Sequence, residues 1–242
     1  MDSLETELDR ARDLAVDDLA DAIESIGFEC TRCGACCKGY DPADDDGESG
    51  DDTAETEAGA TEREPHTATV FPDEIRELQA AGDYDWRDVA RPMPYGLDGD
   101  DGDSDASGET FEWAIQTDAC GDCTFYEESD DGTGACTVHD DRPLICQTYP
   151  FSVALGGTSQ PMGEAVDGEG MVRAHECEGL GRDISREEAE ELAAALKERA
   201  IREIEEAIAV RENYEPRDVD GVVVHDSEGQ KRPDGTKIVA DE

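Results

Sequence analysis

Residues 30–37 read CTRCGACC, a C-x2-C-x2-C-C run that places four thiols within eight positions. Two cysteines separated by two residues can turn both sulfurs toward one metal, as in many zinc and iron–sulfur sites. Gly34 within the run permits the positive φ that such a turn often requires. A cysteine that merely fills a core needs no such spacing. The run therefore predicts four metal ligands, which are Cys30, Cys33, Cys36 and Cys37.

A second group of cysteines follows at a distance along the chain, and it comprises Cys123, Cys136, Cys146 and Cys177. Together with the first run these thiols can serve two four-coordinate metals or one larger cluster. Cys36 and Cys37 are adjacent, and neighbouring side chains tend to point in different directions. We therefore expect these two sulfurs to serve different metals, or different irons of one cluster.

Three further donors lie beside the predicted ligands. Cys120 forms a C-x2-C pair with Cys123, although a spare thiol is the favoured interpretation. His139 and His175 lie near cysteines in the chain and can ligate a metal, but polar histidines without that role are more common. Arg142 either offsets the charge of a thiolate centre or forms an ion pair with one of the many acids, and the sequence weighs these two equally.

The composition is strongly acidic, with 65 Asp and Glu against 20 Lys and Arg and a net charge of -45. Such a chain is either disordered or folded in a cytoplasm of molar salt, where a Debye length of about 3 Å screens repulsion between carboxylates. Amphipathic helices and a cysteine framework favour the second alternative, a haloarchaeon-like protein. The charge argues against nucleic acid and against anionic membrane surfaces as partners.

The compartment is predicted from the N-terminus and the cysteine count. The chain begins with the acidic stretch Met1-Asp2-Ser3, and no apolar run approaches the roughly 18 residues that span a bilayer. The 9 cysteines cannot all pair within the chain. We therefore expect a reducing, cytoplasmic location, in which metal binding is favoured over disulfides.

Apolar residues at helical spacing predict an amphipathic helix from Leu4 to Ile26, ended by Gly27, and another from Ser185 to Arg211 with Ser185 and Glu188 as a capping box. A short helix is expected from Pro72, and a short strand over residues 111–115. Two acidic stretches, 41–64 and 98–109, are predicted to be disordered insertions. These elements predict one α+β, mainly α, irregular cysteine-centred domain over 1–215, with flanking amphipathic helices and short strands. Residues 216–242 would form a tail or hairpin.

Five elements of the chain resemble the YkgJ-type cysteine-cluster family of zinc- or iron-chelating domains. The C-x2-C-x2-C-C run opens the pattern, and a C-x-F-L-like element matches residues 123–126. A C-x-I-Y-x-x-R-P-x-x-C element matches residues 136–146, and Tyr-Pro-Phe follows at 149–151. Longer members carry a late cysteine before a glycine-rich step, as at 177–181. The resemblance spans roughly residues 26–182 and implies that all eight cysteines named above bind zinc or iron.

The chain departs from the family pattern at three positions. His139 stands where the family usually has tyrosine, Tyr126 replaces an aliphatic residue, and Cys120 has no usual counterpart. None of these removes a cysteine of the pattern, so only the composition of the metal shell is affected.

Three functional classes follow from these residues. The cysteines can form a structural zinc core, an iron–sulfur centre that carries electrons or senses redox state, or part of a redox or metal-dependent protein-modifying enzyme. Distant family members include flagellin lysine methylases, but no glycine-rich loop after a strand marks a methyl-donor site here. We therefore expect a metal-binding protein, with Zn²⁺ or an iron–sulfur cluster as alternatives and the enzyme class least favoured.

Overall fold

A computed structural model of the chain describes residues 3–40, 63–98, 106–155, 165–217 and 220–238. Helices make up 38% and strands 23% of it, with four small sheets, so the fold is mixed α/β and the prediction of a mainly α fold is wrong. The described strands have two to five residues each. Such short segments carry too few side chains to show the alternation that marks a strand in sequence.

The described helices fall into a long pair near the termini and shorter pieces between them. They are α1 (Leu4–Asp13), α2 (Val16–Ile26), α3 (Pro72–Ala81), α4 (Trp86–Val89), α5 (Leu144–Thr148) and α6 (Arg186–Asn213), with single 3₁₀ turns η1 (Ala35–Cys37) and η2 (His139–Asp141). Ser185 and Glu188 form the expected capping box of α6, and Pro72 opens α3. The capping signals therefore located two helix starts correctly.

The first helix is broken where the sequence predicts continuity. Leu14 and Ala15 adopt extended conformations between α1 and α2. The break frees the carbonyl oxygen of Leu14, which accepts a 2.7 Å hydrogen bond from Lys197 Nζ on α6. The apolar stripe continues across the break, so periodicity alone does not reveal it.

The strands pair in four small sheets. Their orders are β1-β5-β2, β8-β10-β9, β12-β11-β4-β3 and β6-β7. The strands are β1 (Thr69–Val70), β2 (Ala90–Pro92), β3 (Leu97–Asp98), β4 (Ser107–Thr110), β5 (Trp113–Ile115), β6 (Tyr126–Glu128), β7 (Gly134–Cys136), β8 (Phe151–Val153), β9 (Ala165–Asp167), β10 (Val172–His175), β11 (Val222–Asp226) and β12 (Gly229–Lys231).

Both predicted acidic insertions have ends that pair within the fold. Strand β4 includes residues 107–109 of the second insertion and pairs in parallel with β11, near the C-terminus. Glu64, at the end of the first insertion, pairs with Tyr40. The remainder of these insertions, residues 41–62 and 99–105, lies outside the described residues.

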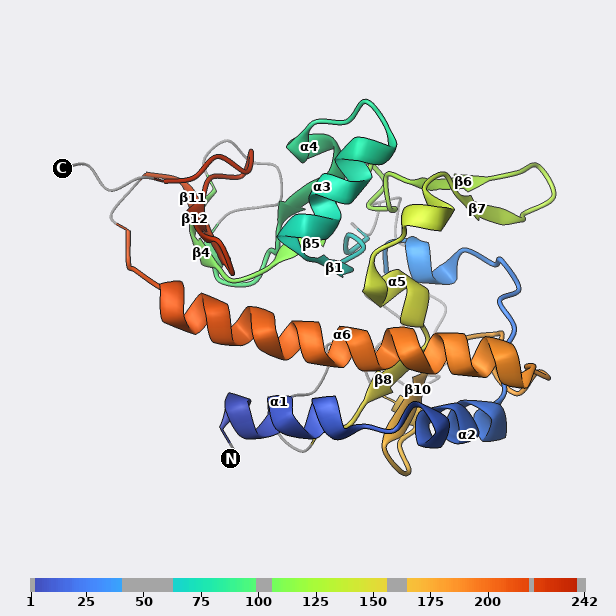
Figure 1. The fold of residues 1–242 in the computed structure, drawn as a ribbon. Helices are drawn as coiled ribbons and strands as arrows, with labels where there is room; N and C mark the ends of the chain where they lie inside the picture. Colours follow the sequence, from blue (N-terminus) through green and yellow to red (C-terminus); the bar gives the residue numbers. More distant parts are fainter. Residues whose placement is uncertain (1–2, 41–62, 99–105, 156–164, 218–219, 239–242) are drawn as a thin grey trace, which may run out of the picture.

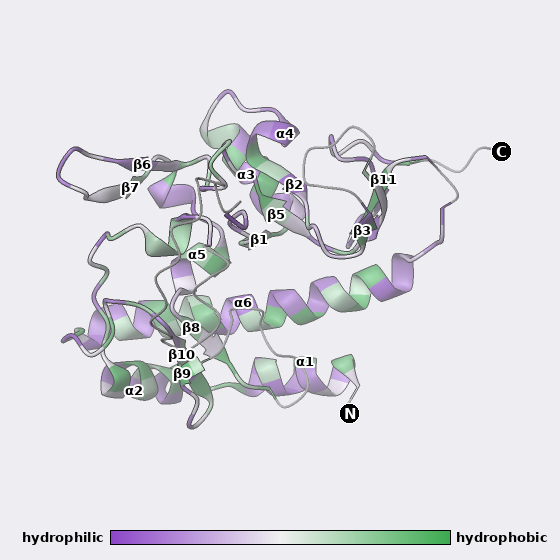
Figure 2. Cartoon of the chain, turned by 180° about the vertical axis from the view of Figure 1, so that it is seen from behind, coloured by the Kyte–Doolittle hydropathy of each residue, from purple (hydrophilic) through white to green (hydrophobic). Residues whose placement is uncertain are grey.

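The described residues form two hydrophobic cores, one between α6 and the helices on one side of it and the other among the elements on its other side (Figure 1). The first, which we call the helical core, gathers residues of α1, α2, α6, β8 and β10. The second, the sheet core, gathers residues of α3, β1, β2, β5 and β11. Figure 1 shows α1 and α2 along one side of α6, with α3, α4 and the β1–β5 region on its other side. In Figure 2 the apolar colouring is strong where α2, β8 and α6 meet.

None of the helices in the described ranges combines the length and apolar character that a membrane crossing requires. Even α6, with 28 residues, carries charged side chains throughout.

Candidate metal centre

The first cysteine run lies in a tightly turned loop that follows α2. Gly34 takes the left-handed conformation, with φ 76°, as its position in the run predicts. The amide of Cys37 donates a 2.8 Å hydrogen bond to the carbonyl oxygen of Gly34, which closes the 3₁₀ turn η1. The turn places Cys36 and Cys37 on its single 3₁₀ helical turn, directly after Gly34.

This loop is fastened to the middle of the chain by backbone hydrogen bonds. Gly134, which begins β7, donates to the carbonyl oxygen of Arg32 over 2.7 Å, and Cys123 donates to that of Cys37 over 2.8 Å. A Cβ atom on Gly34 would lie 2.1 Å from the hydroxyl of Tyr126 in β6, so glycine is required for this close approach. In Figure 1 the loop is seen beside α5 and the β6–β7 hairpin.

The start of the loop pairs with the segment that follows Cys177. Glu29 donates to the carbonyl oxygen of Gly179, and Gly181 donates to that of Gly27, each over 3.0 Å. Phe28 and Leu180 are bridge partners between these hydrogen bonds. The antiparallel pairing brings Cys30 and Cys177 to the same end of the helical core, although 146 positions separate them in the chain.

The other three predicted ligands lie on the sheet core. Cys123, Cys136 and Cys146 all pack against it. Cys136 ends β7 opposite Tyr126 of β6, and the amide of Tyr126 donates to the carbonyl oxygen of Cys123 over 2.9 Å. Cys146 lies on the short helix α5. A hairpin, its leading turn and a helix thus direct three thiols to one region.

Burial and repulsion between thiols raise the pKa of several of these cysteines. Burial raises the pKa of Cys123 to about 11 and also raises the pKa of Cys146, to which Cys123, Cys36 and Cys136 add repulsion. Burial likewise raises the pKa of Cys177, with repulsion from Cys33, Cys36 and Cys30. Because thiolates are the ligands, metal binding at these cysteines must release protons.

The guanidinium of Arg142 has the opposite effect on the pKa of three of these thiols. Its positive charge lowers the pKa of Cys36, Cys136 and Cys146, although the raising effects are larger in each case. Arg142 Nε donates to the carbonyl oxygen of His139 over 2.9 Å, which orients the side chain. This direction of effect is the one that compensation of thiolate charge requires, and the choice between the two roles that the sequence allowed stays a prediction.

The sulfurs of Cys36 and Cys37 lie 3.9 Å apart. The two side chains therefore do not diverge, contrary to the premise from which separate metals were expected. A hydrogen bond with Cys37 is the largest of the effects that raise the pKa of Cys36. The spacing resembles the separation of about 3.8 Å that two thiolates have on one tetrahedral ion with metal–sulfur bonds of about 2.3 Å. In the described parts of the chain, no three side chains of Cys, His, Asp or Glu converge closely enough to hold a metal ion.

The additional donors lie in different surroundings. Cys120 is exposed on a turn in which its amide donates to Asp118 Oδ1 over 2.8 Å. His139 is exposed, with Nδ1 3.4 Å from the carboxylate of the neighbouring Asp140. His175 is buried, and its Nε2 lies 2.8 Å from Ser152 Oγ. The described geometry therefore joins none of the three to the cysteines.

Two tyrosines near the thiols were not singled out as site residues by the sequence. The pKa of Tyr149 is raised by burial, with repulsion from Cys177, Cys36 and Cys33, and its hydroxyl donates to the carbonyl oxygen of Glu176. The pKa of Tyr40 is raised by burial and by repulsion from Cys36 and Cys37. Tyr149 belongs to the Tyr-Pro-Phe element after Cys146, which was the available signal.

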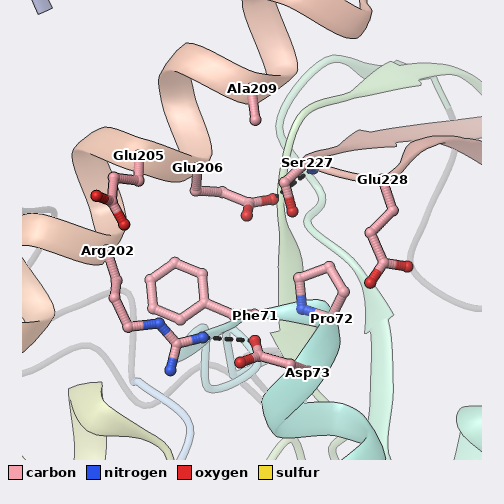
Figure 3. Close-up of a pocket in the computed structure, with 9 residues that line it drawn as sticks. All are labelled: Phe71, Pro72, Asp73, Arg202, Glu205, Glu206, Ala209, Ser227 and Glu228. Atoms are coloured by element: carbon pink, nitrogen blue, oxygen red, sulfur yellow. Dashed lines mark hydrogen bonds and ion pairs between the residues drawn. The ribbon is translucent and has the colours of Figure 1, made fainter. Parts of the chain in front are cut away.

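The surface of the described residues has two open grooves. One, of about 310 Å³, is lined by Phe71, Pro72, Asp73, Arg202, Glu205, Glu206, Ala209, Ser227 and Glu228. Figure 3 shows the Arg202 guanidinium turned to Asp73 and beside the Phe71 ring, with no cysteine or histidine among the labelled residues. The other, of about 360 Å³, lies between η2 and α6 and includes His139 and Arg142. The first groove is thus separate from the thiols.

A family model described as "putative zinc- or iron-chelating domain", CxxCxxCC, matches residues 29–178. That span is more than half of the chain and contains all eight predicted ligands, and the chain belongs to this family. No curated protein and no solved structure matches the chain. Membership makes this a metal-binding protein of the zinc- or iron-chelating class, and thiols are the soft donors that both metals accept.

Proposed function

We propose that the protein binds zinc or an iron–sulfur centre through eight thiolates, and that the metal joins its two hydrophobic cores. The ligands are Cys30, Cys33, Cys36, Cys37, Cys123, Cys136, Cys146 and Cys177. The observation that carries the proposal is the backbone pairing on either side of the cysteine run. Residues 27–29, just before the run, pair with 179–181 at the helical core, and Cys37 at its end accepts a hydrogen bond from Cys123 at the sheet core.

A metal at this position would add a link between two cores that are also joined through α6, whose Arg202 pairs with Asp73 of α3. The chain's 65 acidic residues repel one another, and only 36% of the residues are hydrophobic. Binding of a structural zinc contributes roughly 10–16 kcal/mol in small zinc domains, and this free energy becomes folding free energy. The backbone pairing holds the cysteine segments near one another, and the thiols close on the ion as they lose their protons.

The thiolate set also suits a reducing, cytoplasmic compartment, because all nine cysteines are free. The all-sulfur donor set accepts both zinc and iron–sulfur chemistry. Zinc would act as a structural link, whereas an iron–sulfur centre would add electron transfer or redox sensing.

Anaerobic purification followed by metal and sulfide analysis and a visible spectrum tests this proposal. A colourless protein with bound zinc supports the structural link, and a brown protein with iron and sulfide supports the redox centre. The Cys120→Ser variant is the matched control, and it should retain the full metal content. A wild-type chain that takes up neither metal under reducing conditions would overturn the proposal.

Removal of the metal tests the structural role separately. A chelator should loosen the contact between the helical and sheet cores, so that thermal unfolding changes from one transition to two or moves to lower temperature. An unfolding curve that is identical with and without chelator would show that the metal does not link the cores.

A further inference from the structure

We propose that the surface where the end of α6 meets strands β4 and β11 binds an arginine side chain of a partner polypeptide. The residues that form this site are Glu109, Phe111, Tyr214 and His225. Figures 1 and 2 both show the C-terminal end of α6 beside β11. The site contains no cysteine, and the inference goes beyond the proposed metal binding.

Three aromatic rings from distant parts of the chain meet at this junction. The parallel register of β11 and β4 pairs Val224 with Thr110. The residues that follow them, His225 and Phe111, lie side by side with their rings stacked, at a centroid distance of 5.1 Å and an interplanar angle of 20°. The ring of Tyr214, the C-cap of α6, lies 4.8 Å from that of His225 and 5.9 Å from that of Phe111. The three rings therefore form one aromatic surface.

The carboxylate of Glu109 is held beside this aromatic surface. Its Oε1 lies 3.1 Å from Nε2 of His225, and its Oε2 accepts a hydrogen bond from the Tyr214 hydroxyl over 3.4 Å. Each oxygen keeps a further lone pair, and the side chain of Glu109 is 34% exposed. Two rings thus hold this carboxylate in place, and it stays open to another donor.

The contact with His225 leaves the charge of this carboxylate uncompensated. The side chain of His225 is among the fully buried ones, and its Nδ1 has no hydrogen-bond partner in the described residues. A proton on Nδ1 would be a buried donor without an acceptor, which favours the neutral ring that donates from Nε2. A neutral imidazole and a phenol donate hydrogen bonds to Glu109 but bring no positive charge.

The chain itself supplies no cation to Glu109. Within the described residues this carboxylate pairs with no lysine or arginine, and the sequence has neither residue type in the stretches outside them. Arg217, the first cation after Tyr214 in the chain, pairs with Glu215 over 2.7 Å. The positive charge that complements Glu109 would therefore come from another molecule.

A guanidinium group suits these features better than an ammonium group does. It is planar and stacks on aromatic faces, and Phe111 and Tyr214 are 47% and 41% exposed. It also donates two parallel hydrogen bonds to one carboxylate, and both oxygens of Glu109 have a lone pair left. An ammonium group is a point charge without this planar, two-pronged geometry.

The position of the site favours an arginine on a polypeptide over a free small molecule. Neither of the two grooves described above includes these residues, so a free ligand would bury little of its surface here. A polypeptide adds contacts around its arginine. The net charge of -45 also favours approach of a basic chain.

Binding of a single-arginine peptide to the full chain tests the proposal. The probe is a blocked glycine–arginine–glycine peptide, and its control carries citrulline, which has nearly the same shape without the charge. The titration is done in 1 M KCl, where a Debye length of about 3 Å screens attraction between exposed charges. The arginine peptide should shift the NMR signals of the Phe111, Tyr214 and His225 rings, and the citrulline peptide should not.

Three variants locate the binding. Glu109→Gln removes the charge, keeps an acceptor for His225, and should weaken binding of the arginine peptide at least about tenfold. Phe111→Leu removes a ring face and should weaken it about two- to fivefold. Glu187→Gln removes an exposed charge elsewhere on α6 and should bind the peptide as the wild type does.

Several outcomes would overturn the proposal. Equal ring shifts with the arginine and citrulline peptides would show that the charge is not recognised. A loss of affinity in Glu187→Gln as large as that in Glu109→Gln would show attraction to the acidic surface as a whole. A lysine peptide that binds as tightly as the arginine peptide would overturn the choice of a guanidinium. The citrulline comparison needs no variant, so it tests the site even if Glu109→Gln fails to fold.

Discussion

The backbone amide of Cys123 donates a 2.8 Å hydrogen bond to the carbonyl oxygen of Cys37. This contact joins the first cysteine run to the second group of cysteines, which begins far along the chain. It places the run between the helical and sheet cores before any metal is considered, and so the geometry of the loop should control metal binding.

Substitution of Gly34 should therefore damage the centre. Gly34→Ala introduces a side chain at φ +76° and a Cβ 2.1 Å from the Tyr126 hydroxyl, so both strain and a clash follow. We expect a loss of stability above about 2 kcal/mol and a lower metal content, measured by urea unfolding and metal analysis.

Gly132→Ala is the matched control for this variant. Gly132 has φ +82°, but nothing lies within 4 Å of its added Cβ. Gly132→Ala should lower the free energy of unfolding by only roughly 1 kcal/mol, because a non-glycine residue disfavours a positive φ, and it should retain the full metal content. Equal metal loss in both variants would show that the close approach of Tyr126 is unimportant.

The helix that carries Cys146 should depend on a buried polar contact. Arg199 Nη1 donates to Thr148 Oγ1 over 3.0 Å, Thr148 donates to the carbonyl oxygen of Leu144 over 2.7 Å, and both side chains are buried. Thr148→Val should lower the free energy of unfolding by roughly 1–3 kcal/mol, because it removes the hydroxyl that accepts from the buried Arg199 guanidinium. Denaturant unfolding checks this value.

An exposed ion pair between α1 and α6 provides the comparison. Arg12 and Glu205 are 2.8 Å apart, with exposed fractions of 52% and 48%. Arg12→Met should change the unfolding free energy by less than about 1 kcal/mol. If Thr148→Val were equally mild, α5 would not depend on the buried contact.

The limits of sequence reasoning are visible in particular elements. The caps at Ser185 and Pro72 are local signals, so α6 and α3 were predicted well. Strands β4 and β11 pair across more than a hundred positions, and β4 lies partly in a stretch that its acidic composition marked as an insertion. Short strands of this kind are stabilised by distant partners, which a local pattern cannot show.

The same distinction applies to the metal centre. The spacing of the first run predicts that its cysteines are ligands and that Gly34 is left-handed, because both properties are local, and the structure confirms the conformation of Gly34. The grouping of Cys30 with Cys177 depends on the pairing of Phe28 with Leu180. Spacing gave no information on that pairing, and it suggested divergent side chains for Cys36 and Cys37, whose sulfurs in fact lie close together.

Stability should fall on acidification through the protonation of His66. Burial lowers the pKa of His66 from 6.5 to about 4, and its side chain is only 5% exposed. The unfolded chain therefore binds a proton between these pH values and the folded chain does not. The stabilisation is complete above pH 6.5 and is lost as the pH falls toward 4, with a total of about 3 kcal/mol.

Unfolding of the wild type and of His66→Gln at several pH values measures this contribution. The difference between the two proteins removes the effects of the thiols, which are common to both. The variant should lose less stability than the wild type between pH 7 and pH 4. Parallel curves would show that His66 does not titrate in this range.

Salt should stabilise the fold, because the net charge is -45. We expect the melting temperature to rise between about 0.1 M and 1 M KCl, as the Debye length falls from about 10 Å to 3 Å. Glu187 and Glu191 are exposed like charges one turn apart on α6, and their replacement by Gln should reduce the dependence on salt. A melting temperature that falls with salt would contradict the expected adaptation to a saline cytoplasm.

Arg142 should control how readily one part of the metal centre loads. Its charge lowers the pKa of Cys36, Cys136 and Cys146, so Arg142→Gln should raise these pKa values and reduce the thiolate fraction at neutral pH. Zinc affinity, measured by competition with a chromophoric chelator, should fall several-fold, and the pH at which loading is half complete should rise. Arg142→Lys keeps the charge and should restore most of the affinity.

The position of Arg142 also makes this prediction specific to one set of cysteines. The charges with the largest effect on the pKa of Cys177 are those of Cys33, Cys36 and Cys30. If Cys177 binds a different ion from Cys136 and Cys146, Arg142→Gln should weaken only one of two binding steps. Arg182→Gln is the control, because Arg182 is exposed and its carboxylate partner is Glu29, 3.9 Å away. Equal weakening of both steps by Arg142→Gln, with no effect of Arg182→Gln, would mean that all eight thiolates share one electrostatic environment and respond to its charge together.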